Sequence, residues 1–295
     1  MAGSQVVSVL QWVQCVADTL IRLIGPLFVL LALTLTSSVI YVWWVVLLPL
    51  HVPQVVSFWG LIHCMVAACL IVNILYNYIS CIITPPGTPS KEQMADLAAE
   101  DGDDGSAFCK KCNCVKPRRA HHCHVCKRCV LKMDHHCPWI HNCVGFYNHR
   151  YFVLFLIYMW AGCLYVAFMS SAPFFESEAK PWPYPIGRGS VVFVFVLTLS
   201  ICLALTFMMV WQLYLVITAQ TTIEFYFNRF RKKEAAQHGE VWVNEYDLGT
   251  WRNLDQFFGY RGQWWRIFFP AFSPPPGDGI HYPTLVESSV NYLYV

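Results

Sequence analysis

The stretch that decides the fold is KMDHHCPWIHNCVGFYNHRYF, residues 132–152. It carries four histidines and two cysteines, and its last residues begin a long apolar run. Histidine and cysteine at this density are typical of zinc ligation or of thiol chemistry. The pattern indicates a metal-binding or catalytic segment at the mouth of a membrane helix.

The composition is that of a membrane protein. Charged residues make up 13% of the 295 residues and hydrophobic residues 56%, whereas a soluble domain carries about 25% charge. The apolar residues fall in four runs, and each reaches the roughly 20 residues that a helix needs to cross about 30 Å of hydrocarbon. We therefore expect a membrane α-helical fold with four transmembrane helices, at 26–50, 55–79, 151–172 and 191–217.

The distribution of lysine and arginine orients these helices. Ten of the 20 basic residues lie in 80–150, seven follow the fourth apolar run, and the two outer loops hold only Lys180 and Arg188. Basic residues are retained on the cytosolic side of a membrane, so both termini and the central segment are expected in the cytosol. Because the cytosol is reducing, the eight cysteines in 109–143 favour metal binding or catalysis over disulfides.

The N-terminal segment, residues 1–25, is mostly apolar and small, with polar residues at helical spacing on one face: Gln11, Gln14, Asp18 and Arg22. This spacing predicts a cytosolic interfacial helix before the first span. A lengthened first span is the alternative.

Two further segments are expected outside the bilayer. Residues 80–108 are predicted to be a linker, and its acidic part, 91–106, is expected to be flexible. Residues 218–295 are expected to form a cytosolic C-terminal region.

A 14-residue repeat lies within the cysteine-rich domain, 109–150. The pattern C-x2-C-x9-H-x6-C occurs twice, the second copy shifted by 14 residues. Three thiolates and one imidazole match the closed tetrahedral ligand set of structural zinc. The predicted ligand sets are Cys109, Cys112, His122 and Cys129, and Cys123, Cys126, His136 and Cys143. Spacing alone leaves open another partition, in which Cys109, Cys112, Cys123 and Cys126 form a four-cysteine ribbon.

Cys137 is left without zinc partners. A third shift by 14 residues places it at the first cysteine of the pattern, but Ile140 replaces the second cysteine. A cysteine nucleophile needs a base and a group that orients the base. His135 and Asp134 supply these residue types within four residues, so the three predict a catalytic site. The alternative is that Asp134 and His135 brace a zinc ligand by hydrogen bonding.

Three motifs together carry a family resemblance. Asp-His-His-Cys stands at 134–137 between the second and third of four spans, Thr-Thr-Ile-Glu stands at 221–224, and an aromatic element with Asn253 spans 244–259. With these motifs the sequence resembles the DHHC family of protein S-acyltransferases and its TTxE motif. It departs from the family at 84–87, Thr-Pro-Pro-Gly in place of an Asp-Pro-Gly, and at His141, where asparagine is common.

The resemblance implies an enzyme that transfers a palmitoyl group from acyl-CoA to cysteines of membrane-associated proteins. It implies Cys137 as the acylated nucleophile, His135 as its base and Asp134 as the group that orients the base. It also implies that the two interleaved sets hold two structural Zn²⁺ ions.

The domain at 109–143 is basic, with eight Lys and Arg against one acid. Such a patch suits the phosphates of CoA and anionic lipid headgroups equally. By resemblance, Lys116, Arg119 and His121 are the candidates for CoA contacts. Trp139 fits the headgroup level, where its ring can pack on the start of the acyl chain.

Gly162 lies eleven residues past Tyr151, roughly 16 Å along a helix and near the bilayer midplane. In the family a third-span residue at this depth closes the acyl cavity, and a glycine there implies room for a long chain. The alternative is a glycine that packs two helices together.

The competing class is a non-catalytic, zinc-stabilised membrane adaptor, which has no need of the spare thiol of Cys137. A RING-type ubiquitin ligase has different Cys/His spacing, and no nucleic-acid partner is expected because the basic patch is held at a membrane. The last residues, 293–295 (Leu-Tyr-Val), match a PDZ-type ligand weakly. By family habit, the endoplasmic reticulum or Golgi membrane is expected.

Overall fold

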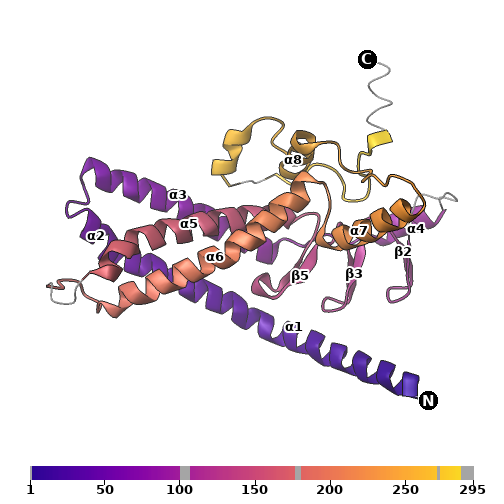
Figure 1. Cartoon of the computed structure of the whole chain (residues 1–295), viewed down its shortest axis with the longest axis horizontal. Helices are drawn as coiled ribbons and strands as arrows, with labels where there is room; N and C mark the ends of the chain where they lie inside the picture. The colour runs from indigo at the N-terminus through magenta and orange to yellow at the C-terminus, as the bar shows by residue number, and fades with distance from the viewer. Residues whose placement is uncertain (1, 100–106, 177–180, 271–272, 287–295) are drawn as a thin grey trace.

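The computed structural model describes residues 2–99, 107–176, 181–270 and 273–286. Long helices lie side by side at one end of the molecule, and three β-hairpins with the C-terminal helices lie at the other (Figure 1). The hairpins stand between the second and third long helices in chain order.

The helices are α1 (Ala2–Val42), α2 (Leu48–His51), α3 (Phe58–Ile83), α4 (Lys91–Ala99), α5 (His149–Phe175), α6 (Gly189–Ile217), α7 (Thr222–Gln237) and α8 (Thr250–Phe258). The π-helical turn η1 spans Trp43–Leu47, and the 3-10 turns η2 and η3 span Pro138–Ile140 and Trp264–Phe268. The strands are β1 (Ala107–Cys109), β2 (Cys114–Lys116), β3 (His121–Cys123), β4 (Arg128–Val130), β5 (His135–Cys137) and β6 (Asn142–Val144).

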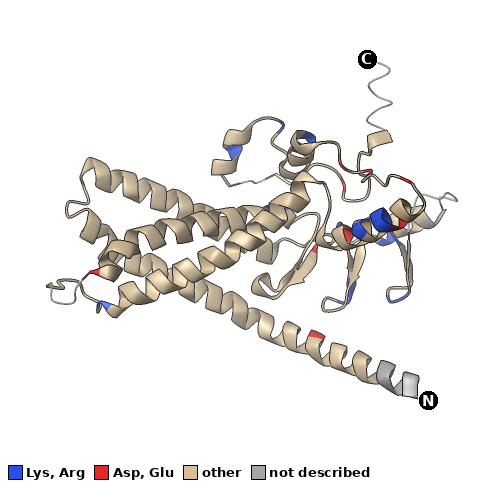
Figure 2. Cartoon of the chain, in the orientation of Figure 1, with Lys and Arg blue, Asp and Glu red and all other residues tan. Residues whose placement is uncertain are grey.

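Within the described residues, four helical segments are long and apolar enough to cross a bilayer: Val9–His51, Phe58–Ile83, His149–Phe175 and Gly189–Ile217. They carry few charged residues, whereas Lys and Arg gather on the hairpins and α7 (Figure 2). This arrangement fits a multi-pass membrane protein. The predicted fold, four membrane helices with a cysteine-rich domain between the second and third, is confirmed.

The first helix runs without a break through Gly25 and Pro26, where the sequence analysis separated an interfacial helix from a span. Its N-terminal part packs along the hairpins, with Ile21 against the cluster that contains Cys123. A side chain at Gly25 would collide with the ring of His141. Glycine therefore permits the close approach between α1 and the turn after η2.

The three hairpins repeat one geometry every 14 residues. Their pairings start at Ala107↔Lys116, His121↔Val130 and His135↔Val144. The turn residue with a positive φ recurs at the same interval, at Asn113, Lys127 and His141. The third hairpin thus keeps the backbone of the first two even though its sequence has lost the second cysteine.

Two asparagines fix the end of α3. The Nδ2 of Asn142 donates to the carbonyl oxygens of Cys81 (3.2 Å) and Thr84 (3.0 Å). Asn148, which is fully buried, donates to the Cys81 carbonyl at 3.3 Å and to the Cys143 carbonyl at 2.8 Å. The last carbonyls of a helix need such partners. The end of α3, where Thr84 begins the stretch that differs from the family's usual sequence, is therefore hydrogen-bonded directly to β6 and to the start of α5.

The acidic linker is partly ordered. Ser90 and Gln93 form a reciprocal cap, since the Gln93 N–H donates to Ser90 Oγ at 3.1 Å and the Ser90 N–H donates to Gln93 Oε1 at 2.8 Å. This capping box starts α4. The expectation of a flexible segment is wrong for Lys91–Ala99, and residues 100–106 lie outside the described residues.

Candidate active site

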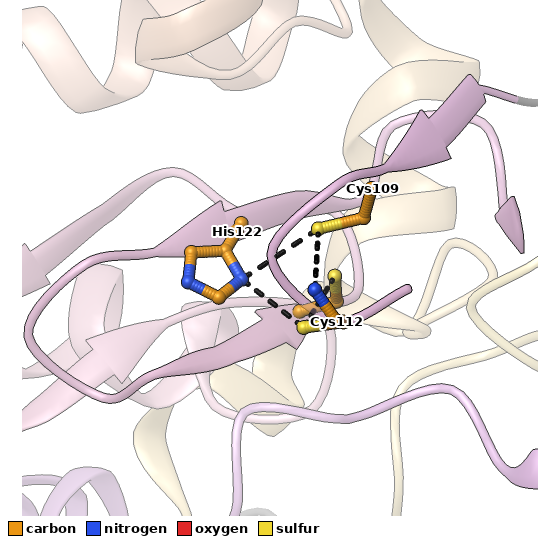
Figure 3. Close-up of side chains that lie close together, drawn as sticks. Cys109, Cys112 and His122 are labelled. Carbon is orange, nitrogen blue, oxygen red and sulfur yellow. Dashed lines mark hydrogen bonds between the residues drawn. The ribbon is translucent and has the colours of Figure 1, made fainter. Parts of the chain in front are cut away.

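The first predicted ligand set comes together between the first two hairpins. Figure 3 shows the sulfur atoms of Cys109 and Cys112 directed at the ring of His122. The two Sγ atoms lie 3.7 and 3.1 Å from His122 Nδ1. Cys129 completes the group, with its Sγ 3.6 Å from that of Cys112.

The second ligand set repeats this arrangement between the second and third hairpins. The Sγ atoms of Cys123, Cys126 and Cys143 lie 3.8, 3.4 and 3.5 Å from His136 Nδ1. The four-cysteine ribbon is not formed among the described residues, because its cysteines are divided between the two groups.

Both groups fit zinc. Tetrahedral Zn²⁺ with Zn–S near 2.3 Å and Zn–N near 2.0–2.1 Å places its ligand atoms about 3.5 to 3.8 Å apart, and the separations above run from 3.1 to 3.8 Å. In each group the ligand atoms lie within 4.8 Å of one another. Each ion would join two neighbouring hairpins, and the pair would hold the three hairpins as one unit.

Cys137 ends β5 at the position that the first zinc cysteine holds in β1 and β3. It belongs to neither ligand group. Ile140, which is fully buried, stands where the second cysteine of the pattern would be. The Cys137 side chain is buried and lines an apolar cavity. The third hairpin therefore holds a thiol in a rigid zinc-finger geometry without a metal site for it.

His135 lies between Asp134 and this thiol. Its Nδ1 is 2.7 Å from Asp134 Oδ2, and its Nε2 is buried with no hydrogen-bond partner among the described residues. Burial disfavours the charged ring, but the hydrogen bond to Asp134 and the nearby Cys137 outweigh it and raise the pKa of His135 to about 9. His135 Nε2 is thus the ring atom available to exchange a proton with Cys137.

The Asp134 carboxylate is fully buried and fully hydrogen-bonded. Its Oδ1 accepts the Thr222 N–H at 2.6 Å, and its Oδ2 accepts the Thr222 hydroxyl at 3.0 Å. Gln212 Nε2 also donates to Oδ2, at 3.0 Å. Burial opposes the charge, but the hydrogen bond from His135, the nearby His149 and the Thr222 N–H together hold the pKa of Asp134 well below its usual range.

Sequence reasoning singled out the Thr-Thr-Ile-Glu motif but missed Gln212 on α6 and His149 on α5. Gln212 Oε1 lies 2.8 Å from His149 Nε2, so these two residues extend the network away from Asp134. The signal in the sequence was that Gln212 and His149 are polar residues in otherwise apolar helices, where polar side chains often have a functional role.

An apolar cavity of about 410 Å³ lies among α1, α3, α5 and α6 and includes Cys137 in its lining. Trp139 also lines it, with its ring 4.7 Å from that of Phe28. Gly162 lines the cavity next to Ile74, whose Cδ1 would be 3.0 Å from a Cβ at Gly162. The predicted Cys137, Trp139 and Gly162 are therefore brought to one cavity.

Arg119 is engaged by the C-terminal region. It donates to both oxygens of Glu224, at 2.6 and 2.7 Å. The faces of Tyr246 and Tyr282 lie 4.3 and 4.8 Å from its guanidinium carbon. Glu224 also closes a capping box with Thr221 at the start of α7. Arg119, a candidate for CoA contact, thus joins the cysteine-rich domain to α7.

Lys116 and His121 lie nearby on β2 and β3. Lys116 Nζ donates to the Ala120 carbonyl at 3.0 Å. The ring of His121 is parallel to that of Phe227 on α7 at 6.3 Å. Burial, with the neighbouring Lys116, lowers the pKa of His121 to about 4, so its ring is neutral at physiological pH.

Asn253 fixes the C-terminal element against the end of α6. Its Nδ2 donates to the Ile217 carbonyl at 2.8 Å and to Asp247 Oδ1 at 2.6 Å. Its Oδ1 accepts the N–H of Leu248 at 3.0 Å. The aromatic element is thereby joined to the end of the fourth span.

The comparisons with known proteins all point to one family. The family model described as DHHC palmitoyltransferase matches residues 103–229. The chain is 31% identical to Palmitoyltransferase ZDHHC16A of Danio rerio, over 92% of this chain and 82% of that protein. It is 34% identical to Palmitoyltransferase ZDHHC16 of Mus musculus, over 89% of this chain and 75% of that protein. It is 30% identical to Palmitoyltransferase ZDHHC15 of Xenopus laevis, over 88% of this chain and 81% of that protein.

Proposed function

Because the chain belongs to the DHHC palmitoyltransferase family and is a protein S-acyltransferase, we propose that Cys137 is the nucleophile that carries the acyl group. One observation carries this assignment. Cys137 lines the apolar cavity and lies beside His135, whose Nδ1 is held by Asp134 at 2.7 Å. A thiol, a base and an orienting carboxylate at the mouth of an acyl-sized cavity are what thioester exchange needs.

The donor is a long-chain acyl-CoA such as palmitoyl-CoA. Cys137 gives its proton to His135 Nε2, and its sulfur attacks the carbonyl carbon of the donor thioester. The bond from that carbon to the CoA sulfur breaks, and the departing CoA thiolate takes the proton from His135. The Asp134 carboxylate stabilises the imidazolium through this step.

The acceptor is a cysteine of a membrane-associated protein. Its thiol gives a proton to His135 Nε2 and attacks the Cys137 thioester. The Cys137 sulfur leaves and is reprotonated by His135, so the enzyme returns to its first state. One thioester replaces another in both steps, and positioning supplies most of the acceleration.

The acyl chain occupies the cavity among the four spans, with Trp139 at its start and Gly162 beside its inner part. Lys116 and His121 contact the CoA head, and Arg119 supports that surface by holding α7 in place. Zinc ions held by the two ligand groups would supply rigidity, and the proton transfers belong to Cys137 and His135.

The protein resides in the endoplasmic reticulum or Golgi membrane with both termini and the cysteine-rich domain in the cytosol. The excess of Lys and Arg on the hairpins and α7 supports this orientation (Figure 2). A PDZ-type partner at residues 293–295 stays a prediction, since those residues lie outside the described part of the chain.

The test compares purified wild-type protein with Cys137→Ser, using Cys114→Ser as the matched control. Cys114 begins β2 and belongs to neither ligand group. Wild type and Cys114→Ser should form a hydroxylamine-labile acyl-enzyme with palmitoyl-CoA, and Cys137→Ser should form none while it retains both zinc ions. An acylated Cys137→Ser protein would overturn the assignment of Cys137 as the nucleophile. A Cys137→Ser protein that binds a single zinc ion would mean that Cys137 is a zinc ligand, and would favour the adaptor function instead.

A further inference from the structure

We propose that Gln212 and His149 are positioning residues that fix the Asp134 carboxylate and, through it, the tautomer and orientation of His135. The inference rests on the proposed roles of Cys137 and His135. It adds two residues from membrane spans to a site that the motifs place in the cysteine-rich domain.

The two residues form a buried polar connection between spans. Gln212 on α6 and His149 on α5 expose 1% and 3% of their surface. Gln212 Nε2 lies 3.0 Å from Asp134 Oδ2, and its Oε1 lies 2.8 Å from His149 Nε2. The ring of His149 stands edge-on to that of Phe257 at 5.0 Å, which restricts its rotation.

The chemistry of the groups gives this chain of hydrogen bonds one direction. An ionised carboxylate only accepts hydrogen bonds, so Gln212 must direct its NH₂ group at Asp134. The amide oxygen is then left for His149, whose Nε2 must carry a proton. If the amide were reversed, its oxygen would face the carboxylate and its NH₂ group would face the His149 N–H. Neither contact would then be a hydrogen bond. A His149 ring with its proton on Nε2 therefore stabilises the amide in the orientation that Asp134 imposes.

The same order of donors and acceptors extends through Asp134 and His135 to the Cys137 thiol. With Oδ2 held in place, the carboxylate accepts the Nδ1–H of His135 at 2.7 Å. This contact assigns the proton of neutral His135 to Nδ1 and leaves Nε2 as the acceptor that faces Cys137. A ring with its proton on Nε2 could not take the proton of the thiol.

Thr222 and Gln212 hold the carboxylate from different parts of the molecule. Thr222 begins α7 and reaches both oxygens from the C-terminal region. Gln212 reaches Oδ2 from a membrane span, and it is not among the residues that line the acyl cavity. Loss of Gln212 should therefore weaken the chemical step without changing the binding of the acyl donor.

The experiment measures Cys137 acylation by palmitoyl-CoA in purified Gln212→Met, which keeps the length of the side chain and removes both hydrogen bonds. The rate constant at saturating donor should fall about tenfold, while KM stays within about twofold of wild type. Thr206→Val is the matched control, because it removes another hydrogen bond between α5 and α6, from Trp160 Nε1 at 2.9 Å. This control should acylate at the wild-type rate.

A double-mutant cycle separates positioning from a general loss of packing. In an Asp134→Asn background the carboxylate is already gone, so adding Gln212→Met should lower the rate by less than about twofold. An additional tenfold loss in that background would overturn the inference. His149→Phe, which keeps a ring against Phe257, provides a second variant and should also lower the rate with KM unchanged.

The outcomes distinguish this inference from the proposed function. Acylation of Cys137→Ser would overturn the assignment of the nucleophile and the positioning role together. Acylation that requires Cys137 but proceeds at the wild-type rate in both Gln212→Met and His149→Phe would overturn the positioning role alone.

Discussion

At the scale of single residues, the two ring nitrogens of His135 have different surroundings. Nδ1 is hydrogen-bonded to Asp134. Nε2 is buried without a hydrogen-bond partner among the described residues, and Cys137 is the neighbouring titratable group. Because the pKa of His135 is raised to about 9, a second ring proton, which Nε2 takes from Cys137 in the proposed step, stays on the imidazolium at neutral pH and is lost as the pH rises through that value. A protonated ring can neutralise the departing CoA thiolate, so activity should decline on the alkaline side as His135 deprotonates.

Asp134→Asn tests this dependence. The substitution removes the carboxylate that raises the pKa of His135 and leaves the burial that lowers it, so the pKa should fall. We expect the alkaline limb of the acylation rate to move to lower pH, and the rate near pH 8 to drop at least about tenfold. The measurement is the acylation rate between about pH 6 and 10, with zinc content determined in parallel.

Asp278→Asn is the matched control for this substitution. Asp278 also contacts a histidine, His281, at 2.6 Å, but this pair is exposed in the C-terminal region. Its removal should leave the pH profile unchanged. An alkaline limb in Asp134→Asn that coincides with that of wild type would contradict the role assigned to Asp134.

At the scale of elements, the three hairpins show how one geometry serves two purposes. The first two hairpins place a strand-end cysteine in a zinc group, and the third places Cys137 at the same position beside the cavity. His122 and His136 lie in the middle of β3 and β5 and direct Nδ1 at the zinc groups. His135 precedes His136 by one residue, so its side chain points to the opposite face of the strand.

His122→Ala and His135→Ala should therefore differ in kind. Loss of His122 removes a ligand that joins the first hairpin to the second, so one zinc ion should be lost and the protein should melt at a lower temperature. His135→Ala should keep two zinc ions and its melting temperature but acylate at least about a hundredfold more slowly. Zinc analysis and thermal unfolding of the two purified variants provide the measurement. An equal loss of zinc in both would contradict the separation of roles.

At the scale of the whole molecule, the apolar cavity proposed to hold the acyl chain exists only because four spans meet around it. Residues from α1, α3, α5 and α6 line it, and Cys137 and Trp139 belong to the hairpin at its mouth. The third hairpin is anchored to α3 by Asn142 and to α5 through Asn148. If the acyl chain occupies this cavity as proposed, the depth of the cavity limits how long the chain can be when its carbonyl reaches the thiol.

Gly162→Phe tests the chain-length prediction. A Cβ at this position already approaches Ile74 Cδ1 to 3.0 Å, so a phenyl ring must occupy cavity space or displace α3. If the ring occupies the cavity, the ratio of palmitoyl to myristoyl transfer should fall about tenfold with zinc content and expression intact. Leu164→Phe is the matched control, since Leu164 is exposed on the outer surface of α5. A glycine that only packs helices would instead give lower expression and equal losses for all chain lengths.

Features that depend on the spacing of residues along a short stretch of the chain were predictable from the sequence. The four membrane helices follow from apolar runs long enough to cross a bilayer, and the two zinc ligand sets follow from one spacing that recurs after 14 residues. Asp134, His135 and Cys137 could be grouped because they stand within four residues of one another. The helical cap at Ser90 was missed, although Ser90 and Gln93 have the spacing of a capping box.

The tertiary structure decided which distant polar groups meet. Arg119 has the charge of a CoA ligand, yet folding places it against Glu224 of α7. Gln212 and His149 stand 63 residues apart in two apolar spans and meet beside Asp134. Spacing along the chain carries no information about such contacts. A buried polar side chain must find a hydrogen-bond partner, and only the packing of the helices determines which partner is within reach.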